Sequence, residues 1–444
     1  MRKLTKKKDL VLYGAAGMGV NLLNLMMGSY LCSALLVGGF GEAAIPYQTY
    51  VGRDLIIAGV WAVFYLAAKI VDGIIDIPMA SFADNLRTRF GRRRPAIVIG
   101  LVLMILSYLL FLVIPQPDGA TLLNTVYYGV ILCVFYSFYT LTMVTYYATF
   151  TEIVDTEADR NFISNVKSVC DILYFILGYV AVRALLNGMN IRVVALIVLP
   201  LVLTMLIPLF LIKEPSMQKG EGEMVHSVSL LKSLRYTFRN RTFVLWMIVY
   251  AFMTFGVQLF LGGINEYFSY VGMSMIFVMM SAFAPVPFTL ILYTKIQKKY
   301  GFGVSFRYAL VMFTVGMLAM FGVSFLPQGT AKTVLSIVTG LLSSFAIGSL
   351  FSVAYSIPSQ LAAEEEEKNG VSNSAMYFAV QGLFSGVATG LGTGVVLTAL
   401  KGSQEAASGN IVYLTAISAA GTLIAAVLMG MLPKSLTCWG KEEK

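Results

Sequence analysis

The feature that most constrains this chain is a succession of apolar segments, each long enough to cross a lipid bilayer. A spanning helix needs about 20 apolar residues, and only helices or closed barrels satisfy the backbone polar groups inside a membrane. About twelve segments meet this criterion. They lie at 10–38, 53–82, 95–115, 123–150, 160–186, 191–212, 241–264, 271–296, 303–326, 332–358, 371–399 and 409–432. The sequence therefore predicts an all-α polytopic membrane protein.

Composition excludes several other classes. Hydrophobic residues make up 58% of the chain and charged residues only 12%, which is too apolar for a soluble domain. The net charge of +9 does not indicate nucleic-acid binding, because the basic residues lie between apolar segments, as juxtamembrane anchors do. The four cysteines lack metal-ligand spacing and the single histidine lies in a polar segment. We therefore expect neither an enzyme nor a cofactor.

The distribution of lysine and arginine predicts the orientation of the spans. Basic residues gather at both termini, at 87–94, at 213–241 and at 295–299, whereas the intervening loops carry few. Basic loops remain on the cytosolic side, so an even number of spans places both termini in the cytosol. The first apolar run follows Lys6, Lys7 and Lys8 but lacks an Ala-x-Ala cleavage site, so we expect a retained helix in the cell membrane.

The longest polar segment, 213–241, divides the chain near its middle. It predicts an N-terminal six-helix bundle at 1–212 and a C-terminal one at 242–444, with an amphipathic helix over 228–238 lying on the membrane face. Short basic turns that end in an aromatic residue and a glycine, 88–91 and 298–301, each follow the second span of a half. These turns indicate an internal repeat and hence a pseudo-symmetric fold, in which we expect the monomer to function.

Three charged residues stand inside the second apolar segment, namely Lys69, Asp72 and Asp76. At 100° per residue they fall within an arc of about 60°, so they share one helix face. Lys69 and Asp72 are spaced to pair, which leaves Asp76 one turn away without a local partner. A charge at the bilayer centre costs about 2.5–3.5 kcal/mol, so such carboxylates line a pathway or bind something. The pattern favours a bound Na⁺ or a shared proton, and a structural polar network is the alternative.

Other polar residues within apolar segments are candidates for solute binding. Asn21 in the first segment must face protein or a wet cavity, because a buried amide needs hydrogen bonds in lipid. Lys167 and Asp171, four residues apart in the fifth, either pair with one another or let Lys167 contact a solute. Gln381 in the eleventh segment is a third candidate, and Glu266 is a weaker one.

The polar turn after the second apolar segment offers a cytosolic gate. Asp84, Arg87 and Arg93 could form salt bridges in one access state and break them in the other. The alternative is that these charges only set topology. The acidic run 364–367 is interpreted as a solvated cytosolic turn.

The run 69–78, with its lysine and two aspartates, and the following run 84–95, Asp-Asn-Leu-Arg-Thr-Arg-Phe-Gly-Arg-Arg-Arg-Pro, resemble the signature of a known family. This is the glycoside–pentoside–hexuronide:cation symporter family, the melibiose-permease-like branch of the major facilitator superfamily. Looser similarities occur at 13–14, 152–160 and 377–380. The resemblance implies sugar uptake coupled to Na⁺, Li⁺ or H⁺ by alternating access.

The resemblance also implies roles for particular residues. Asp72 and Asp76 match the cation-site aspartates of the second helix. Lys167 falls near the basic residue of the fifth helix. The family's sugar-binding acid falls at Asn21 and its fourth-helix cation-site acid at about Met143, where Thr142 or Thr145 could supply a hydroxyl instead. The family's eleventh-helix lysine falls at Gly386.

Together, these patterns predict a secondary transporter that brings a sugar, glycoside or similar small polar solute into the cell with Na⁺ or H⁺. Asp72 and Asp76 would bind the cation, as metal ligands if it is Na⁺. Asn21, Lys167 and Gln381 would contact the solute. Two alternatives stay open. The polar groups lost from the first and eleventh helices suit a carrier of a lipid-like or amphiphilic solute, and the acidic run 364–367 with the altered site residues suits a membrane sensor that does not transport.

Overall fold

The computed structural model describes residues 4, 6–153, 157–212, 214, 238–369, 374–402 and 409–441. Within these residues it contains helices and no β-strand beyond an isolated bridge between Thr88 and Gly91. The predicted amphipathic helix at 228–238 lies, apart from its last residue, outside the described part of the chain. The all-α prediction is confirmed.

Ten helical segments among the described residues are long and apolar enough to cross a membrane. An eleventh consists of α14 (Met275–Phe283) and α15 (Val286–Tyr300), which are bent by 40° at a short break. Helix also covers the remaining expected segment, 160–186, as α7 (Glu157–Ile176), the π-helical turn η4 (Leu177–Ala181) and α8 (Val182–Leu185). The chain is a multi-pass membrane protein.

The chain divides into two compact units by its own contacts. Unit 1 comprises residues 1–37 and 43–224, and unit 2 comprises 38–42 and 225–444. Among the described residues, the helices of unit 1 besides α7, η4 and α8 are α1 (Lys7–Ala15), α2 (Met18–Leu25), η1 (Met26–Leu31), η2 (Ser33–Leu35), η3 (Glu42–Ala44, which begins in unit 2), α3 (Ile45–Gln48), α4 (Ala58–Asn85), α5 (Arg93–Phe111), α6 (Leu122–Glu152), α9 (Ile191–Val198), η5 (Leu199–Met205) and α10 (Leu206–Leu211).

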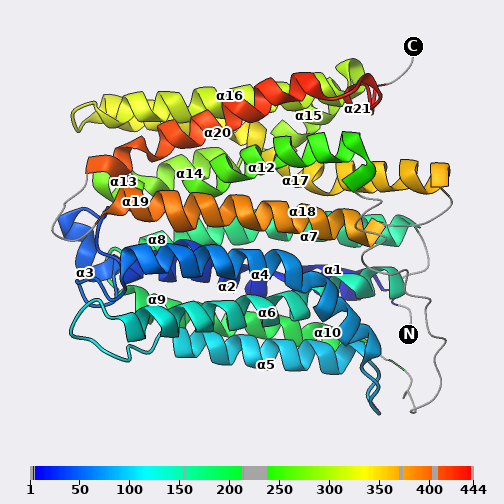
Figure 1. Ribbon diagram of the computed structural model, residues 1–444, viewed down its shortest axis with the longest axis horizontal. Helices are drawn as coiled ribbons and strands as arrows, with labels where there is room; N and C mark the ends of the chain where they lie inside the picture. The colour runs from blue at the N-terminus through cyan, green and yellow to red at the C-terminus, as the bar shows by residue number, and fades with distance from the viewer. Residues whose placement is uncertain are drawn as a thin grey trace. The chain divides into compact units, whose positions relative to one another are not determined.

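In unit 1, α6 packs along both α4 and α5 (Figure 1). The Thr121 hydroxyl caps the start of α6 by accepting a hydrogen bond from the Asn124 amide. The first and fifth spans also run side by side. Asn21 bonds Asp171 and Ser29 bonds Tyr179, and both pairs are separated by 150 residues, so these two spans are parallel. These contacts bring α2, α6 and α7 together around the candidate site.

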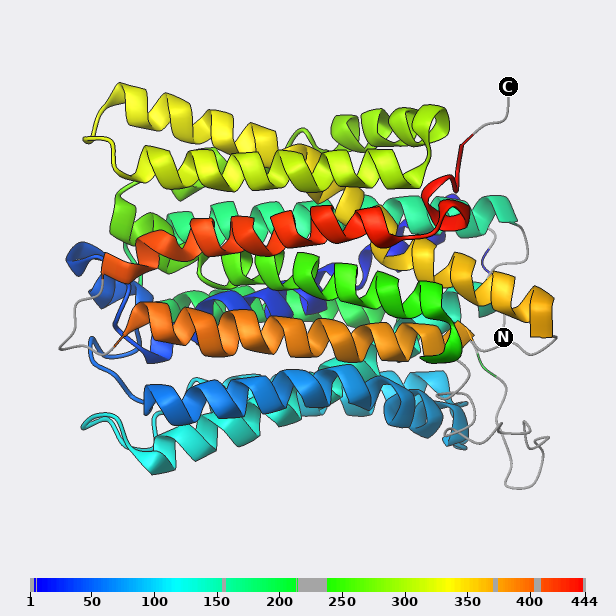
Figure 2. The ribbon, with the colours of Figure 1, turned by 45° about the horizontal axis from the view of Figure 1, so that its top comes forward.

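Unit 2 contains a second bundle. Its helices, besides α14 and α15, are α12 (Arg241–Gly262), α13 (Ile264–Val271), α16 (Phe302–Ser324), α17 (Thr330–Asn369), α18 (Ser374–Thr389), η6 (Gly390–Val396), α19 (Leu397–Lys401), η7 (Gly409–Tyr413), α20 (Leu414–Leu428), η8 (Met429–Met431) and α21 (Lys434–Thr437). Helix α16 packs against α17 and α20, and α12 against α18 and α20 (Figure 2). The acidic run 364–367 lies inside α17, so its interpretation as a turn was wrong.

The two basic segments that indicated an internal repeat share the conformation of their closing glycine, although 298–300 belong to α15 whereas 88–90 follow the end of α4. Gly91 ends the first with φ of 90°, and Gly301 ends the second with φ of 87°. Positive φ is accessible to glycine at little cost, which explains why both segments end in this residue. The internal repeat inferred from the sequence stays a prediction.

Large apolar side chains on the outside of both units suit a bilayer. The most exposed examples are Val63, Phe210, Phe288 and Val427. A soluble protein rarely presents contiguous apolar surface of this kind, whereas lipid tails cover it without a solvation cost.

Candidate solute and cation site

The three charged residues of the second span lie together on α4, as their spacing predicted. Lys69 Nζ donates a hydrogen bond to Asp72 Oδ2 at 3.2 Å, and both side chains remain partly exposed, at 13% and 25%. Asp76 lies one turn further along and interacts electrostatically with Asp72. Among the described residues, no basic side chain forms an ion pair with Asp76.

Helix α6 faces this group with an aromatic ring and a hydroxyl. The Lys69 ammonium lies 3.6 Å from the centroid of the buried Tyr136 ring, close enough for a cation–π interaction. Thr140, one turn after Tyr136, has its hydroxyl beside the Asp76 carboxyl. The sequence had indicated Thr142 as a source of this hydroxyl, but Thr142 instead donates to the Phe138 carbonyl.

A second polar cluster joins α2, α6 and α7. Lys167 Nζ donates to Asp171 Oδ2 at 2.5 Å, and Asn21 Nδ2 donates to the other carboxylate oxygen at 3.4 Å. The Tyr139 hydroxyl donates to Asn21 Oδ1 at 3.1 Å, and Lys167 also lies 5.1 Å from the ring centroid of Tyr147. Asn21 and Lys167, the two residues of this unit predicted to contact the solute, therefore both donate hydrogen bonds to the Asp171 carboxylate.

Helix α6 links the two clusters through adjacent residues. Tyr139 bonds Asn21, whereas Thr140 lies beside Asp76. Sequence reasoning missed Tyr139 and Thr140, because tyrosine and threonine are ordinary helix-packing residues in a membrane. For Thr140, the available signal was its four-residue spacing from Tyr136 on one helix face.

The predicted solute residue Gln381 and the two positions where the family has a charged residue, Gly386 and Met143, carry no charge themselves. Gln381 is buried on α18 in unit 2, and Gly386 is buried one turn later. Met143, where the family's acid would fall, lies on the face of α6 that approaches Gly17 and is therefore in an apolar contact. These positions supply no further charge to the candidate site.

The predicted gate residues lie at the junction of α4 and α5. Arg87 is exposed, Arg93 is buried at the start of α5, and the side chain of Asp84 lies outside the described part of the structure. The Glu214 carboxylate accepts hydrogen bonds from the backbone amides of Arg93 and Arg94 at 3.0–3.2 Å, and so caps α5 with a negative charge. The gating role of these residues stays a prediction.

Unit 2 holds a buried ion pair of a different kind. Lys401 Nζ bonds Glu266 Oε1 at 2.7 Å, and their side chains are only 3% and 0% exposed. The segment 38–42 covers this pair. The Phe40 ring centroid lies 4.7 Å from the ammonium, and Gly41 donates its amide to the Ser269 hydroxyl at 3.2 Å.

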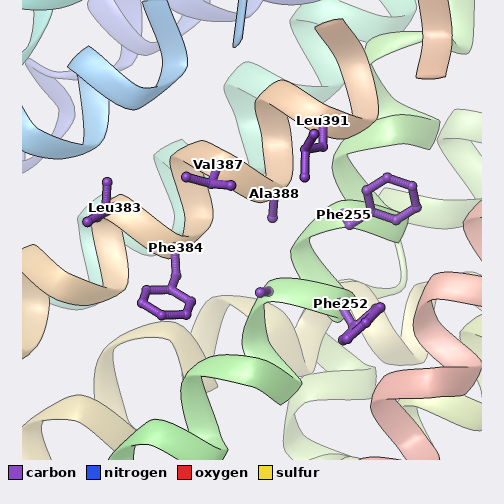
Figure 3. Close-up of a pocket in the computed structure, with 8 residues that line it drawn as sticks. Phe252, Phe255, Leu383, Phe384, Val387, Ala388 and Leu391 are labelled. Atoms are coloured by element: carbon purple, nitrogen blue, oxygen red, sulfur yellow. The ribbon is translucent and has the colours of Figure 1, made fainter. Parts of the chain in front are cut away.

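An apolar pocket of about 550 Å³ lies in unit 2 between α12 and the α18–η6 segment (Figure 3). Its lining consists of Ala251, Phe252, Phe255, Leu383, Phe384, Val387, Ala388 and Leu391. Such a lining offers no hydrogen bonds to a polar solute. The pocket is therefore unsuited to sugar hydroxyls, and an aliphatic group fits its chemistry better.

Within the described residues, no three His, Cys, Asp or Glu side chains gather in a group that could hold a metal ion. The α4 site offers two carboxylates and one hydroxyl instead. Oxygen ligands of this type bind hard cations, and a carboxylate can equally carry a proton. The side chains present therefore fit a proton directly, and Na⁺ with additional oxygen ligands.

Solved structures with the same fold are transporters of the major facilitator type. A point mutant of the nucleoside transporter NupG matches with a TM-score of 0.65 at 13% identity, over 96% of this chain and all of its own. A bacterial homologue of the iron transporter ferroportin, in an inward-facing state, matches at 0.62 with 14% identity, over 97% and 99%. A POT family transporter in complex with a thioalcohol-conjugated peptide matches at 0.63 with 11% identity, over 96% and 97%.

The family match defines the class of protein, which is a membrane transporter. The sequence profile of the family described as MFS/sugar transport protein matches residues 12–432. The chain belongs to this family. No protein of curated function matches the sequence.

Proposed function

We propose that the protein is a secondary transporter that carries a sugar, glycoside or similar small polar solute together with one cation, by alternating access. The observation that carries the proposal is the Asp76 carboxylate. It lies in a membrane-spanning helix, next to a second carboxylate and without a basic partner among the described residues. An isolated charge of this kind is costly in a membrane, and a bound cation or proton removes the cost.

Counting charges supports a single cation. In the two clusters of unit 1, Lys69 pairs with Asp72 and Lys167 pairs with Asp171, so each pair is neutral. Asp76 then contributes one negative charge. One Na⁺ or H⁺ per cycle neutralises the group, whereas a divalent ion would leave an excess positive charge.

The second cluster supports a polar solute with hydroxyl groups. Asp171 accepts hydrogen bonds, Asn21 can both donate and accept, and Lys167 donates. The hydroxyl groups of a sugar can replace the hydrogen bonds that these residues now make with one another. The family description names sugar transport, which agrees with this chemistry.

Cation binding can be tested without knowing the solute. Thermal unfolding of the purified protein would be followed in sodium chloride, in choline chloride of equal ionic strength, and at two pH values. We expect a stabilisation by Na⁺ or by acid that Asp76→Asn abolishes, because the amide cannot be neutralised further. Asp171→Asn is the matched control, since it removes a carboxylate of the same unit and should keep the response. An unchanged response in Asp76→Asn would refute the cation site.

Transport itself requires proteoliposomes. Uptake of a panel of radiolabelled mono- and disaccharides would be measured with and without an inward Na⁺ or H⁺ gradient. We expect gradient-driven accumulation of at least one sugar, lost in Asp76→Asn and weakened in Asp171→Asn. Uptake that only equilibrates the sugar and that no gradient affects would leave the carrier assignment but remove the coupling.

The apolar pocket of unit 2 favours a second candidate, a carrier of an amphiphilic solute. Its aromatic and aliphatic lining matches an acyl chain, and its volume suits a short one. Lysolipid would then stabilise the protein more than any sugar does, and Phe255→Ser, which places a hydroxyl in the lining, would reduce that effect. A larger shift with a sugar would favour the first proposal.

A further inference from the structure

Arg183 lies near the end of the fifth span, and the proposed transport gives it no role. It stands on α8, directly after η4. Its Nη1 atom is buried and has no hydrogen-bond partner among the described residues. No carboxylate among those residues forms an ion pair with it, and the neighbouring polar group is the Tyr30 hydroxyl.

The surroundings of Arg183 are built from two π-helical turns. Tyr30, in η1 of the first span, donates its hydroxyl to the Gly178 carbonyl of η4 at 2.7 Å. Ser29 and Tyr179, from the same two turns, share a hydrogen bond at 3.3 Å. Such turns are rare and occur frequently at functional sites. The tyrosine hydroxyls are therefore held in place while the guanidinium keeps an unused donor.

The energetic position of Arg183 is unusual. A buried donor without an acceptor costs about 1–3 kcal/mol, and the Nη1 atom of Arg183 is such a donor. A neutral acceptor would satisfy the hydrogen bond but not the charge. An oxyanion satisfies both, and the planar guanidinium matches carboxylate and phosphate geometry.

The site is separate from the solute cluster. Twelve residues separate Asp171 from Arg183, which corresponds to about 18 Å along a helix. A small solute cannot touch both residues at once. An anion at Arg183 therefore binds independently of the solute and cation of the proposed cycle.

From these observations, we propose that Arg183, with Tyr30 beside it and Tyr179 one turn before it in the same span, forms an oxyanion-binding site for a carboxylate or phosphate group. The group can belong to a soluble anion or to the headgroup of an anionic lipid. In either case the ligand stabilises this part of unit 1.

The test uses the full-length purified protein in a neutral detergent and follows its thermal unfolding. One arm adds inorganic phosphate against chloride at equal ionic strength, and the other adds phosphatidylglycerol against phosphatidylcholine. We expect one arm to raise the midpoint of wild type and to leave Arg183→Gln unchanged. The phosphate arm identifies a soluble anion, and the lipid arm identifies a headgroup.

Arg192→Gln is the matched control. Arg192 lies in the same unit, but its Nε donates to the Leu112 carbonyl at 3.0 Å and its guanidinium lies over Tyr50. This variant should keep the ligand response although it loses a protein contact. The same response in Arg183→Gln as in wild type, or none in wild type in either arm, would overturn the proposal.

Stability without ligand provides a second criterion. Removing a guanidinium whose buried Nη1 donor has no acceptor should leave the midpoint of the ligand-free protein unchanged or higher, whereas removing Arg192 should lower it. A clear loss of ligand-free stability in Arg183→Gln would mean that Arg183 already serves the fold, and would reject the site. Should that variant fail to express, Arg183→Lys must show a reduced ligand response, because an ammonium cannot donate bidentately.

Discussion

The ion pairs of the two units use the same chemistry in opposite settings. In unit 1, Lys167 and Asp171 are one turn apart on α7 and keep 22% and 15% of their side chains exposed. In unit 2, Lys401 and Glu266 come from different helices and are almost fully buried. Partial exposure leaves the first pair open to other hydrogen-bond partners, whereas segment 38–42 covers the second pair. Burial therefore separates a pair that can function in binding from one that holds the fold.

The largest effect on stability is expected from breaking the buried Lys401–Glu266 pair. Glu266→Gln leaves the Lys401 ammonium buried without a counter-charge, and such losses cost about 3–5 kcal/mol. The free energy of unfolding, measured in detergent by denaturant titration, should fall by this amount. The double variant Glu266→Leu with Lys401→Met should recover most of it, since replacing both partners by apolar residues is often neutral. A double variant as unstable as the single one would contradict this reasoning.

A smaller loss is expected from disturbing the cover of the buried Lys401–Glu266 pair. A Cβ atom on Gly38 would collide with the Lys401 carbonyl oxygen, so Gly38→Ala should cost about 1–3 kcal/mol. Gly322→Ala in α16 is the control, because nothing lies within 4 Å of the added methyl group. It should be neutral or slightly stabilising, since alanine favours helix. Equal midpoints for the two variants would show that segment 38–42 does not seal the pair.

The Lys167–Asp171 pair of unit 1 should behave differently. Lys167→Met should lower stability by less than Glu266→Gln does, because Asp171 keeps its hydrogen bond from Asn21 and 15% of its side chain stays exposed. Solute affinity should nevertheless fall about tenfold or more, which corresponds to about 1.4 kcal/mol. Equilibrium binding of the best sugar from the transport panel would measure it. A large loss of stability with unchanged affinity would place Lys167 with the structural pairs.

The smallest expected effect belongs to Tyr139. Tyr139→Phe removes the hydrogen bond to Asn21 and keeps the ring, so it should cost about 0.5–1.5 kcal/mol in solute binding. The same assay applies, with Tyr127→Phe as the control. The Tyr127 hydroxyl bonds the Leu110 carbonyl at the exposed surface of α6, away from Asn21. A similar loss in both variants would count against a role for Tyr139 in orienting Asn21.

Contacts within one helix could be predicted from the sequence. Lys69 pairs with Asp72, and Lys167 with Asp171, because residues three or four apart share a helix face whatever the tertiary structure. The spans themselves followed from apolar length alone. Both predictions rest on local spacing, which the sequence states directly.

Contacts between helices could not be predicted in this way. Thr140 faces Asp76, and Lys401 bonds Glu266 across 135 positions, but no periodicity in the sequence links such partners. The orientation of α6 decides that Thr140 rather than Thr142 reaches the carboxylate. The acidic run 364–367 was misassigned for a related reason, since α17 continues well beyond its apolar part.

Segment 38–42 has a consequence for how the protein is assembled. It is grouped with unit 2, although the residues on both sides of it belong to unit 1. The polypeptide therefore passes between the units at 37/38, 42/43 and 224/225, and not only in the central polar segment. If the chain were severed in the central polar segment, the amino-terminal fragment would keep segment 38–42. The partners of this segment, Lys401 for the Phe40 ring and Ser269 for the Gly41 amide, would be on the other fragment. Two such fragments, expressed separately in one cell, should therefore bind each other through segment 38–42.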